Sequence, residues 1–354
     1  MNRQPCVDVN VFVYNGAETV TATIESVLGQ TWTAMVVTVI DNASTDDTCA
    51  IVARFAARDR RVNLLRNTLN VGPVMNCQRA LWQGQSSFVM PKTSDDLLAP
   101  DFVAALMDVL LADEGVAMCH AAGLVFDDDG SVRQSYPMAH CLNADGSDPL
   151  ARARHVMTHY TSAPAFWGIY RRDAVERLAP LMYRPGWDHA VLAELALYGR
   201  IRSVAETLFW RRHGGKDVAA LARGCSQFTQ RGLELDDGLA DLFWRLPLVG
   251  TAYGHIERFA VARLDGRQRR DLMADVPPIF RARWLPMMRQ EAARFRSGLP
   301  ALMDRITDEG DVAVLWAGRQ MTDALTALQA LLPEEDFATE RIMVQAYASR
   351  RMAA

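Results

Sequence analysis

The sequence lacks the features that mark secreted and membrane-spanning proteins. Its six cysteines show no CxxC spacing, a pattern typical of free thiols in a reducing compartment and not of a disulfide framework. No window offers about 18 uninterrupted apolar residues, and the N-terminal stretch has no apolar signal core. We therefore expect a cytoplasmic protein without a transmembrane span. A peripheral contact with the inner face of a membrane stays open, carried by an amphipathic stretch at residues 240–248.

Excess positive charge is also missing. The formal net charge is −4, and the basic residues form no tail or stripe, whereas proteins that grip nucleic acid gather Lys and Arg against the phosphates. Nucleic acid is therefore not the expected partner. The sequence contains neither GxGxxG nor GxxxxGK[ST], the two common glycine-rich phosphate loops. A phosphate ligand would therefore need another source of positive charge, such as a divalent metal.

What is present predicts a large α/β domain followed by helices. The 354 residues, half of them hydrophobic, exceed the usual size of one core. Segments rich in β-branched residues alternate with helical patterns, an order that predicts an open, mostly parallel sheet flanked by helices. Helical patterns dominate from residue 215 onward. We therefore expect domains at 1–214 and 215–354. The first strands are expected at residues 7–13, 35–40, 62–66 and 88–90, and a later one at 166–170.

Polar residues follow three of these strands closely. In an open parallel sheet, ligands bind beyond the carboxyl ends of the strands, because loops and helix N-termini converge there. Mg²⁺ and Mn²⁺ take one or two carboxylates and complete their shell with water and phosphate oxygens. The pair in "SDD" can therefore hold a metal, although two adjacent aspartates are also typical of a solvated loop. The residues at the three strand ends are Tyr14 and Asn15, Asp41 and Asn42, and Ser94, Asp95 and Asp96.

Several ordered motifs resemble one known family. The stretches "VNVFVYNGAETVTATIESVLGQTW", "VVTVIDNASTDDT", "LLRNTLNVGPVMNCQRALWQG" and "SDDLLAPDFV" are similar to the nucleotide-binding half of family 2 glycosyltransferases with the GT-A fold. The later stretch "WDHAVLAELALYGRIRSVAETLFWRRHGG" resembles the acceptor half of that family. The resemblance spans about residues 5–215. It implies a Rossmann-like GT-A domain in which residues 1–100 bind the nucleotide sugar and residues 101–214 form the acceptor side.

The resemblance also implies a role for each residue at the strand ends. Tyr14 and Asn15 would meet the nucleotide, and Asp41 and Asn42 would contact base and ribose. Asp95 would face the ribose or the metal, and Asp96 would bind Mn²⁺ or Mg²⁺ on the diphosphate. Three positions depart from the family pattern: Thr93 stands where an aspartate usually opens the acidic motif, Asn42 replaces an aspartate, and Phe12 stands where proline is common.

Further residues implied by the resemblance belong to the transfer step. Asp188 matches the catalytic base, which takes the proton of the acceptor hydroxyl during inverting transfer; the alternative is a helix N-cap. Trp167 and Trp187 would line the acceptor site or pack in a core. A basic cluster would stabilise the departing diphosphate, and its histidine is also a candidate metal ligand. The cluster comprises Arg211, Arg212 and His213.

The function implied is metal-dependent, inverting transfer of a sugar from a nucleotide-sugar donor to a saccharide or lipid-linked acceptor in cell-surface polysaccharide or glycoconjugate synthesis. One alternative is a catalytically silent GT-A domain that acts as a nucleotide-sugar-binding module or as an assembly module. Another is a nucleotidyltransferase, which would carry a glycine-rich, basic phosphate loop near its N-terminus; "VYNGAETV" is not such a loop. The sugar, the linkage and the oligomeric state stay open.

Overall fold

The computed structural model describes residues 4–136, 141–159, 163–181, 184–213, 246–307 and 311–352. The chain divides into two compact units. The sheet unit comprises Met1–Leu181 and Val191–Gly215, and the helical unit comprises Met182–Ala190 and Lys216–Ala354. The segment Met182–Ala190 therefore groups with the helices, although it precedes the boundary expected after residue 214.

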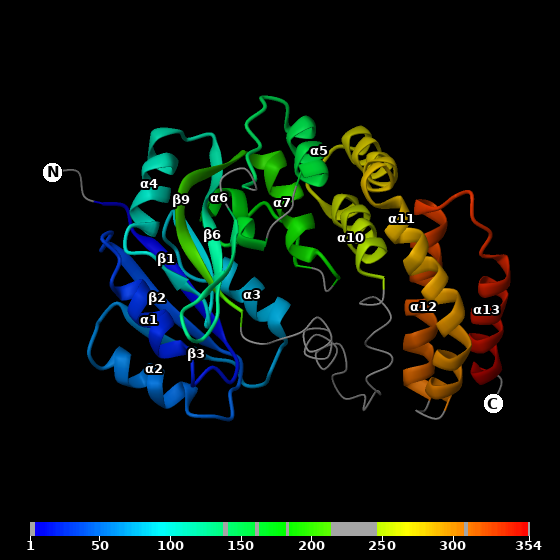
Figure 1. The fold of residues 1–354 in the computed structure, drawn as a ribbon, viewed down its shortest axis with the longest axis horizontal. Coiled ribbons are helices and arrows are strands. Elements are labelled where there is room, and N and C mark those ends of the chain that lie inside the picture. The colour runs from blue at the N-terminus through cyan, green and yellow to red at the C-terminus, as the bar shows by residue number, and fades with distance from the viewer. Residues whose placement is uncertain are drawn as a thin grey trace. The chain divides into compact units, whose positions relative to one another are not determined.

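The sheet unit is built on one mixed sheet with the strand order β3-β2-β1-β4-β8-β6-β9-β5, and β7 pairs with β6 (Figure 1). Strands β1 to β4 are parallel to one another, as the sequence predicts. Strand β8 is antiparallel to β4 and β6, and β9 runs parallel to β6. The strands are β1 Val7–Val13, β2 Met35–Asp41, β3 Val62–Arg66, β4 Phe88–Thr93, β5 Leu97–Leu98, β6 Val116–Phe126, β7 Val132–Tyr136, β8 Ile169–Arg171 and β9 Arg200–Arg212.

Successive side chains of β1 point to opposite faces of this sheet. Val9 and Val11 are fully buried in the main core cluster, which also contains residues of α1, α2 and α4. Asn10 points to the other face, where its amide donates to the carbonyls of Ala80, at 2.7 Å in α3, and Gln83, at 2.9 Å just after it. The helices of this unit are α1 Val20–Leu28, α2 Thr48–Ala56, α3 Pro73–Trp82, α4 Phe102–Ala112, α5 Pro149–His159, α6 Arg172–Val175 and most of α7 Trp187–Tyr198.

Two strands differ from their expected bounds by more than one residue. Strand β4 continues past Pro91 to Thr93 and stays paired with β1 to that residue, whereas in the described sheet β8 pairs with β4 only at Phe88 and Val89. The strand expected at residues 166–170 is instead a 3₁₀ turn, Ala163–Phe166, followed by the short β8. The longer β4 places its end directly beside the "SDD" loop.

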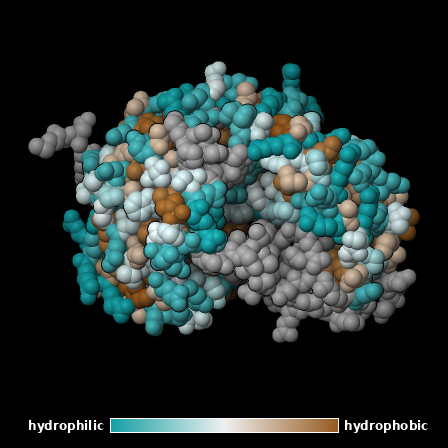
Figure 2. Space-filling view, viewed as in Figure 1, coloured by the Kyte–Doolittle hydropathy of each residue, from teal (hydrophilic) through white to brown (hydrophobic). Residues whose placement is uncertain are grey.

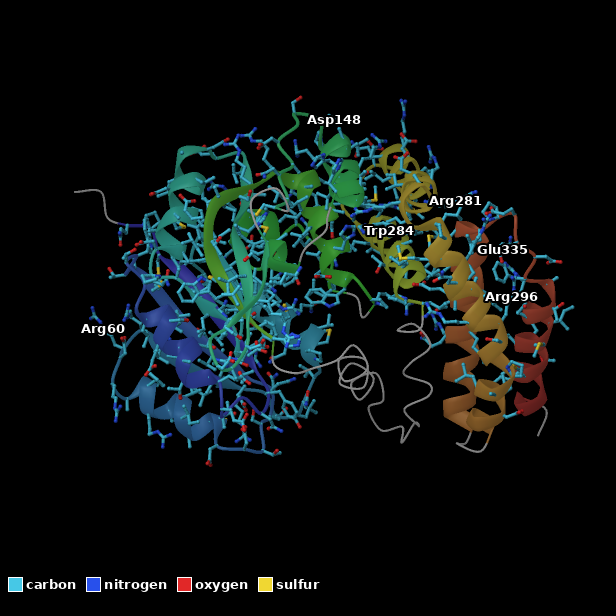
Figure 3. All side chains as sticks on the ribbon, in the orientation of Figure 1. Arg60, Asp148, Arg281, Trp284, Arg296 and Glu335 are labelled. Carbon is cyan, nitrogen blue, oxygen red and sulfur yellow. The ribbon has the colours of Figure 1, made fainter. Side chains whose placement is uncertain are left out.

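The described part of the helical unit consists of α10 Pro247–Val261, α11 Gly266–Thr307, α12 Asp311–Leu331 and α13 Ala338–Met352. Helices α11, α12 and α13 lie side by side (Figure 1). Ion pairs join α11 to the residues between α12 and α13, as in Arg296–Glu335 at 2.7 Å (Figure 3). The expected fold class, a mostly parallel α/β sheet followed by a helical region, is confirmed.

None of the helices that the structure describes is both long and apolar enough to cross a bilayer. On the face drawn in Figure 2, hydrophobic residues are scattered in small groups among hydrophilic ones. The amphipathic stretch considered for membrane contact, 240–248, lies largely outside the described residues.

Candidate active site

The "SDD" loop connects β4 to β5, and main-chain contacts hold it in place. The fully buried ammonium group of Lys92 donates to the carbonyls of Asp96, at 2.7 Å, and Thr93, at 3.1 Å. The Thr23 hydroxyl of α1 donates to the same Asp96 carbonyl at 3.1 Å. Because these carbonyls bind inward, the loop presents its side chains at the carboxyl end of the sheet.

The carboxylate of Asp96 is almost completely buried and accepts two hydrogen bonds from the protein. The Thr93 hydroxyl donates to one oxygen at 2.5 Å, and the main-chain N–H of Arg212 donates to the other at 3.0 Å. Burial raises the pKa of Asp96, although the charge of Lys92 opposes that shift. Thr93, which replaces the aspartate usual in the family, thus donates a hydrogen bond at a position where a second carboxylate would repel Asp96.

Asp95 lies beside Asp96 with a partly exposed side chain. Its carbonyl accepts a hydrogen bond from the Arg212 guanidinium at 3.2 Å, and that guanidinium also pairs with Asp128 at 2.5 Å. The structure therefore brings Asp95, Asp96 and Arg212 together from the loop and from the end of β9. Arg211 and His213 flank Arg212 in sequence and are partly exposed.

Lys92 gives this loop a testable pH dependence. Burial lowers the pKa of Lys92 to about 8, although Asp96 and Asp95 act in the opposite direction. The unfolded chain, with an ordinary lysine pKa near 10.5, then binds more protons than the folded chain between about pH 8 and 10.5, so stability should rise with pH in that window. We expect the free energy of unfolding of wild type, relative to Lys92→Met, to increase by roughly 3 kcal/mol across it.

Urea unfolding of both proteins at each pH measures this difference, because the alkaline titration of other groups cancels between them. If the free energy of unfolding of wild type, relative to that of Lys92→Met, stays constant or falls between pH 8 and 10.5, the folded state does not hold Lys92 with a lowered pKa.

The loops after β1 and β2 meet near the same edge. Asn15 has a positive φ of 47°; its N–H donates to the Ser44 hydroxyl at 2.9 Å, and its side-chain oxygen accepts from the Thr45 N–H at 2.9 Å. A Cβ on Gly16 would lie 3.3 Å from the Ser94 hydroxyl oxygen, so this glycine lets the first loop approach the "SDD" loop closely. Tyr14 is 44% exposed at the end of β1.

Asp41 is fully buried beneath the loop that follows β2. Its carboxylate accepts the Ser44 N–H at 3.1 Å and pairs with Arg66 Nε at 3.2 Å. Burial, together with the hydrogen bond and charge of Asp41, raises the pKa of Cys49 to about 11, so the thiol stays protonated. Asp41 thus shapes the loop at the end of β2.

The Asn42 side chain is also buried, and protein groups take up its hydrogen-bonding capacity. Its amide donates to the side-chain oxygen of Asn70, at 2.6 Å, and to the Gly72 carbonyl, at 3.4 Å. Its oxygen accepts from the Asn67 amide at 2.8 Å and from the Val71 N–H at 2.9 Å. These hydrogen bonds join Asn42 to the loop 67–72, so a role in positioning that loop stands beside the expected contact with the nucleotide.

Asn42→Asp tests that role. Aspartate has the same size but cannot donate, so the Asn70 oxygen and the Gly72 carbonyl would each lose one of two donors and face a carboxylate oxygen instead. We expect a loss of about 1–3 kcal/mol in the free energy of unfolding, measured by urea denaturation. The matched control is Asn63→Asp at an exposed site, where we expect no measurable change. Equal stability of the two variants would contradict the positioning role.

The remaining predicted residues come from other parts of the sequence than Asp95, Asp96 and Arg212. Trp167 packs against Phe12, at 6.0 Å between ring centroids, and against Phe166 at 5.0 Å, and it adjoins the main core. This favours the packing alternative for Trp167. Asp188 is the second residue of α7, and both it and Trp187 are partly exposed. Both belong to the segment that groups with the helical unit.

The residues present fit a sparse divalent-metal site. Among the described residues, no three His, Cys, Asp or Glu side chains cluster as a protein-built cage. Asp95 offers a partly exposed carboxylate, and each Asp96 oxygen keeps a lone pair beyond its one hydrogen bond. Two carboxylates match what Mg²⁺ or Mn²⁺ requires when phosphates and water supply the other ligands. A cation would also favour the ionised form of the buried Asp96.

Comparisons with known proteins agree with this architecture. Residues 8–179 match the family model described as Glycosyl transferase family 2. The chain is 27% identical over 179 residues to YibD of Escherichia coli K12, an uncharacterized glycosyltransferase. This alignment covers 49% of this chain and 51% of YibD. It is 29% identical over 133 residues to chondroitin synthase of Escherichia coli, covering 37% of this chain and 19% of the synthase.

Among solved structures, the fold is similar to that of S. aureus TarS 1–349 in complex with UDP-GlcNAc, with a TM-score of 0.56 and 15% sequence identity, over 92% of this chain and 90% of that one. At this identity the similarity concerns the fold, which is GT-A. Residues 8–179 thus belong to glycosyl transferase family 2, and the sheet unit that contains them has the GT-A fold.

Proposed function

We propose that this protein transfers a sugar, with inversion, from a nucleotide-sugar donor to a saccharide or lipid-linked acceptor, and that it requires Mn²⁺ or Mg²⁺. The observation that carries the proposal is the cluster of Asp95, Asp96 and Arg212 at the carboxyl end of a parallel sheet. This is the edge where open α/β sheets bind their ligands, and no glycine-rich phosphate loop competes for the role.

On the donor side, the exposed ring of Tyr14 supplies a surface on which a nucleobase can stack. Asp41 and Asn42 hold the surrounding loops, and Asn15 ties the loop after β1 to the loop after β2. Arg212 is fixed on the "SDD" loop, and with Arg211 and His213 it would face the diphosphate as negative charge develops on the leaving group.

For the metal, we assign Asp95 as the accessible ligand and Asp96 as the buried one. The metal, when bound, would neutralise the diphosphate as it departs. Thr93 and the Arg212 N–H hold the Asp96 carboxylate in place. His213 remains a candidate for the diphosphate or the metal.

Asp188 is the proposed base. It lies in the first turn of α7, and a carboxylate there can take the proton of an acceptor hydroxyl that comes within hydrogen-bond reach. Trp187, its neighbour, remains the candidate to stack on the acceptor sugar. Similarity to chondroitin synthase supports a saccharide acceptor and a role in polysaccharide synthesis. The competing proposal is a domain that binds the nucleotide sugar without transferring it.

Thermal unfolding in the presence of UDP-, GDP-, dTDP- and CMP-sugars, each with and without Mn²⁺, tests the proposal. UDP-GlcNAc is included because TarS is seen bound to it. Ligand that binds the folded state alone stabilises it by about 2.7 kcal/mol at 100 times Kd, so we expect one class of donor to raise the unfolding temperature only when Mn²⁺ is present. If none of the donors shifts unfolding under either condition, the nucleotide-sugar site is wrong.

A further inference from the structure

The segment that carries Asp188 is anchored to the helical unit. Residues on both sides of Asp188, namely Arg184, Gly186 and His189, contact one helix, α10. The two α10 residues that meet Gly186 and His189 are Thr251 and His255, which lie four positions apart and so share one face of that helix. Helix α10 thus contacts the segment 184–190 at three points.

The first anchor is ionic. The Arg184 guanidinium forms a two-pronged pair with Glu257, with Nε to Oε2 at 2.8 Å and Nη2 to Oε1 at 3.0 Å. It also lies 3.7 Å from Asp323 of α12. The side chains of Arg184 and Glu257 are only 15% and 22% exposed. Such paired, partly buried geometry restrains an arginine more than a single surface contact does.

The second anchor is a close approach of main chain to helix. Gly186 has a positive φ of 63°, and a Cβ built there would lie 2.4 Å from the Thr251 hydroxyl oxygen. A larger residue would therefore both strain the backbone and push the segment from α10. The turn that leads into α7 is held against the helix at a distance that only glycine permits.

The third anchor is a buried histidine pair. His189 Nδ1 and His255 Nε2 are 2.5 Å apart, and Phe280 of α11 packs against both rings. Burial, and then the neighbouring His189 ring, lower the pKa of His255 well below its ordinary range. His255 is therefore neutral at neutral pH, and the two rings can share one proton in a hydrogen bond.

We propose that the helical unit, through Glu257 and His255, fixes the position of Asp188 and so sets the rate of sugar transfer. This inference rests on the proposed role of Asp188 as the base. Glu257 and His255 are positioning residues: they would act through the segment 184–190, leaving the donor site at the end of β4 untouched. A base displaced by about 1 Å can lose up to 100-fold in rate, so weakening one anchor should cost turnover without costing donor affinity.

The test uses the full chain with Glu257→Ala, Glu257→Gln and a matched control. Glu335→Ala removes a carboxylate from the Arg296–Glu335 pair (Figure 3), which has a similar length of 2.7 Å and a similarly shielded glutamate, at 20% exposure. This pair joins α11 to the residues between α12 and α13, and not α10 to the segment 184–190. Two readouts are taken. One is amide hydrogen exchange of residues 184–190, and the other is release of nucleoside diphosphate from the nucleotide sugar that gives the largest thermal shift.

We expect Glu257→Ala to speed exchange in residues 184–190 and to lower kcat about tenfold, with the KM for the donor within twofold of wild type. Glu257→Gln keeps an oxygen acceptor for Arg184 and should recover most of the rate, and Glu335→Ala should match wild type in both readouts. Unchanged exchange and kcat in Glu257→Ala, or an equal loss in Glu335→Ala, would overturn the positioning role.

The proposed function can fail separately. If Asp188→Asn transfers at the wild-type rate, the base is misassigned whatever Glu257 does. If Asp188→Asn is inactive while Glu257→Ala matches wild type in exchange and in kcat, the positioning role alone is overturned.

Discussion

Replacing Asp95 by alanine should abolish the Mn²⁺-dependent part of donor binding. Asp95 is the more exposed of the two carboxylates in the "SDD" loop, so in our assignment it meets the metal directly. Loss of residues that merely support metal ligands already costs about 10- to 100-fold in metal affinity. We therefore expect the donor Kd in Mn²⁺ to rise at least about 100-fold in isothermal titration.

The stability of Asp95→Ala should stay within about 0.5 kcal/mol of wild type, as expected for partly exposed sites. Asp96→Ala should differ, because the Arg212 N–H and the Thr93 hydroxyl would lose their acceptor, at a cost of about 1–3 kcal/mol. The exposed Asp108→Ala on α4 is the control for loss of a negative charge. Unaltered donor affinity of Asp95→Ala in Mn²⁺ would remove Asp95 from the metal site.

Asp188→Asn is expected to lower kcat by about 10²–10⁴, the usual contribution of a positioned general base. Donor affinity should not change, because Asp188 is assigned to the acceptor hydroxyl. Asparagine caps helices as well as aspartate does, so a lost cap cannot explain a lost rate. The measurement is nucleoside diphosphate release at saturating donor.

A matched control for Asp188→Asn is available in α5. Asp148, labelled in Figure 3, accepts the N–H groups of Leu150 and Ala151 at the start of that helix. Asp148→Asn makes the same chemical change at a helix N-terminus and should leave kcat at the wild-type value. A kcat for Asp188→Asn that equals the kcat of this control would place the base elsewhere.

The sequence predicts the edge of the sheet well, because local pattern determines it. Continuous apolar runs set the lengths of β1 and β2, so the positions of Tyr14 and Asp41 at their ends follow directly. The adjacent carboxylates of the "SDD" loop are also expected at this edge, although the strand before them was expected to end at residue 90 and extends to Thr93. The GT-A fold and the family membership also follow from the sequence, because several motifs occur in order.

Contacts between distant residues could not be predicted in this way. Nothing in "MPKTSDD" indicates that Lys92 turns inward to bind the carbonyls of its own loop, because that depends on how β4 packs beside α1. The network around Asn42 joins residues about 25–30 positions away, and asparagine identity alone does not reveal its partners.

The grouping of the Asp188 segment with the helical unit is another long-range result. The Arg184–Glu257 pair spans 73 positions, and an alternation pattern contains no signal for such a pair. A glycine after a proline, as in "RPGWD", indicates a turn, but it does not indicate which helix that turn approaches. The contacts between the segment 184–190 and α10 therefore emerge only from the three-dimensional structure.

The most direct test of the central claim is nucleoside diphosphate release by the wild-type full chain. The donor is the nucleotide sugar that stabilises it, supplied with Mn²⁺, and a matched sample contains a metal chelator. A glycosyltransferase is expected to release the diphosphate in Mn²⁺, with water as the slow acceptor and faster with oligosaccharide added, and to lose this activity in chelator. Tight donor binding with no release under any of these conditions would contradict sugar transfer and favour a silent nucleotide-sugar-binding domain.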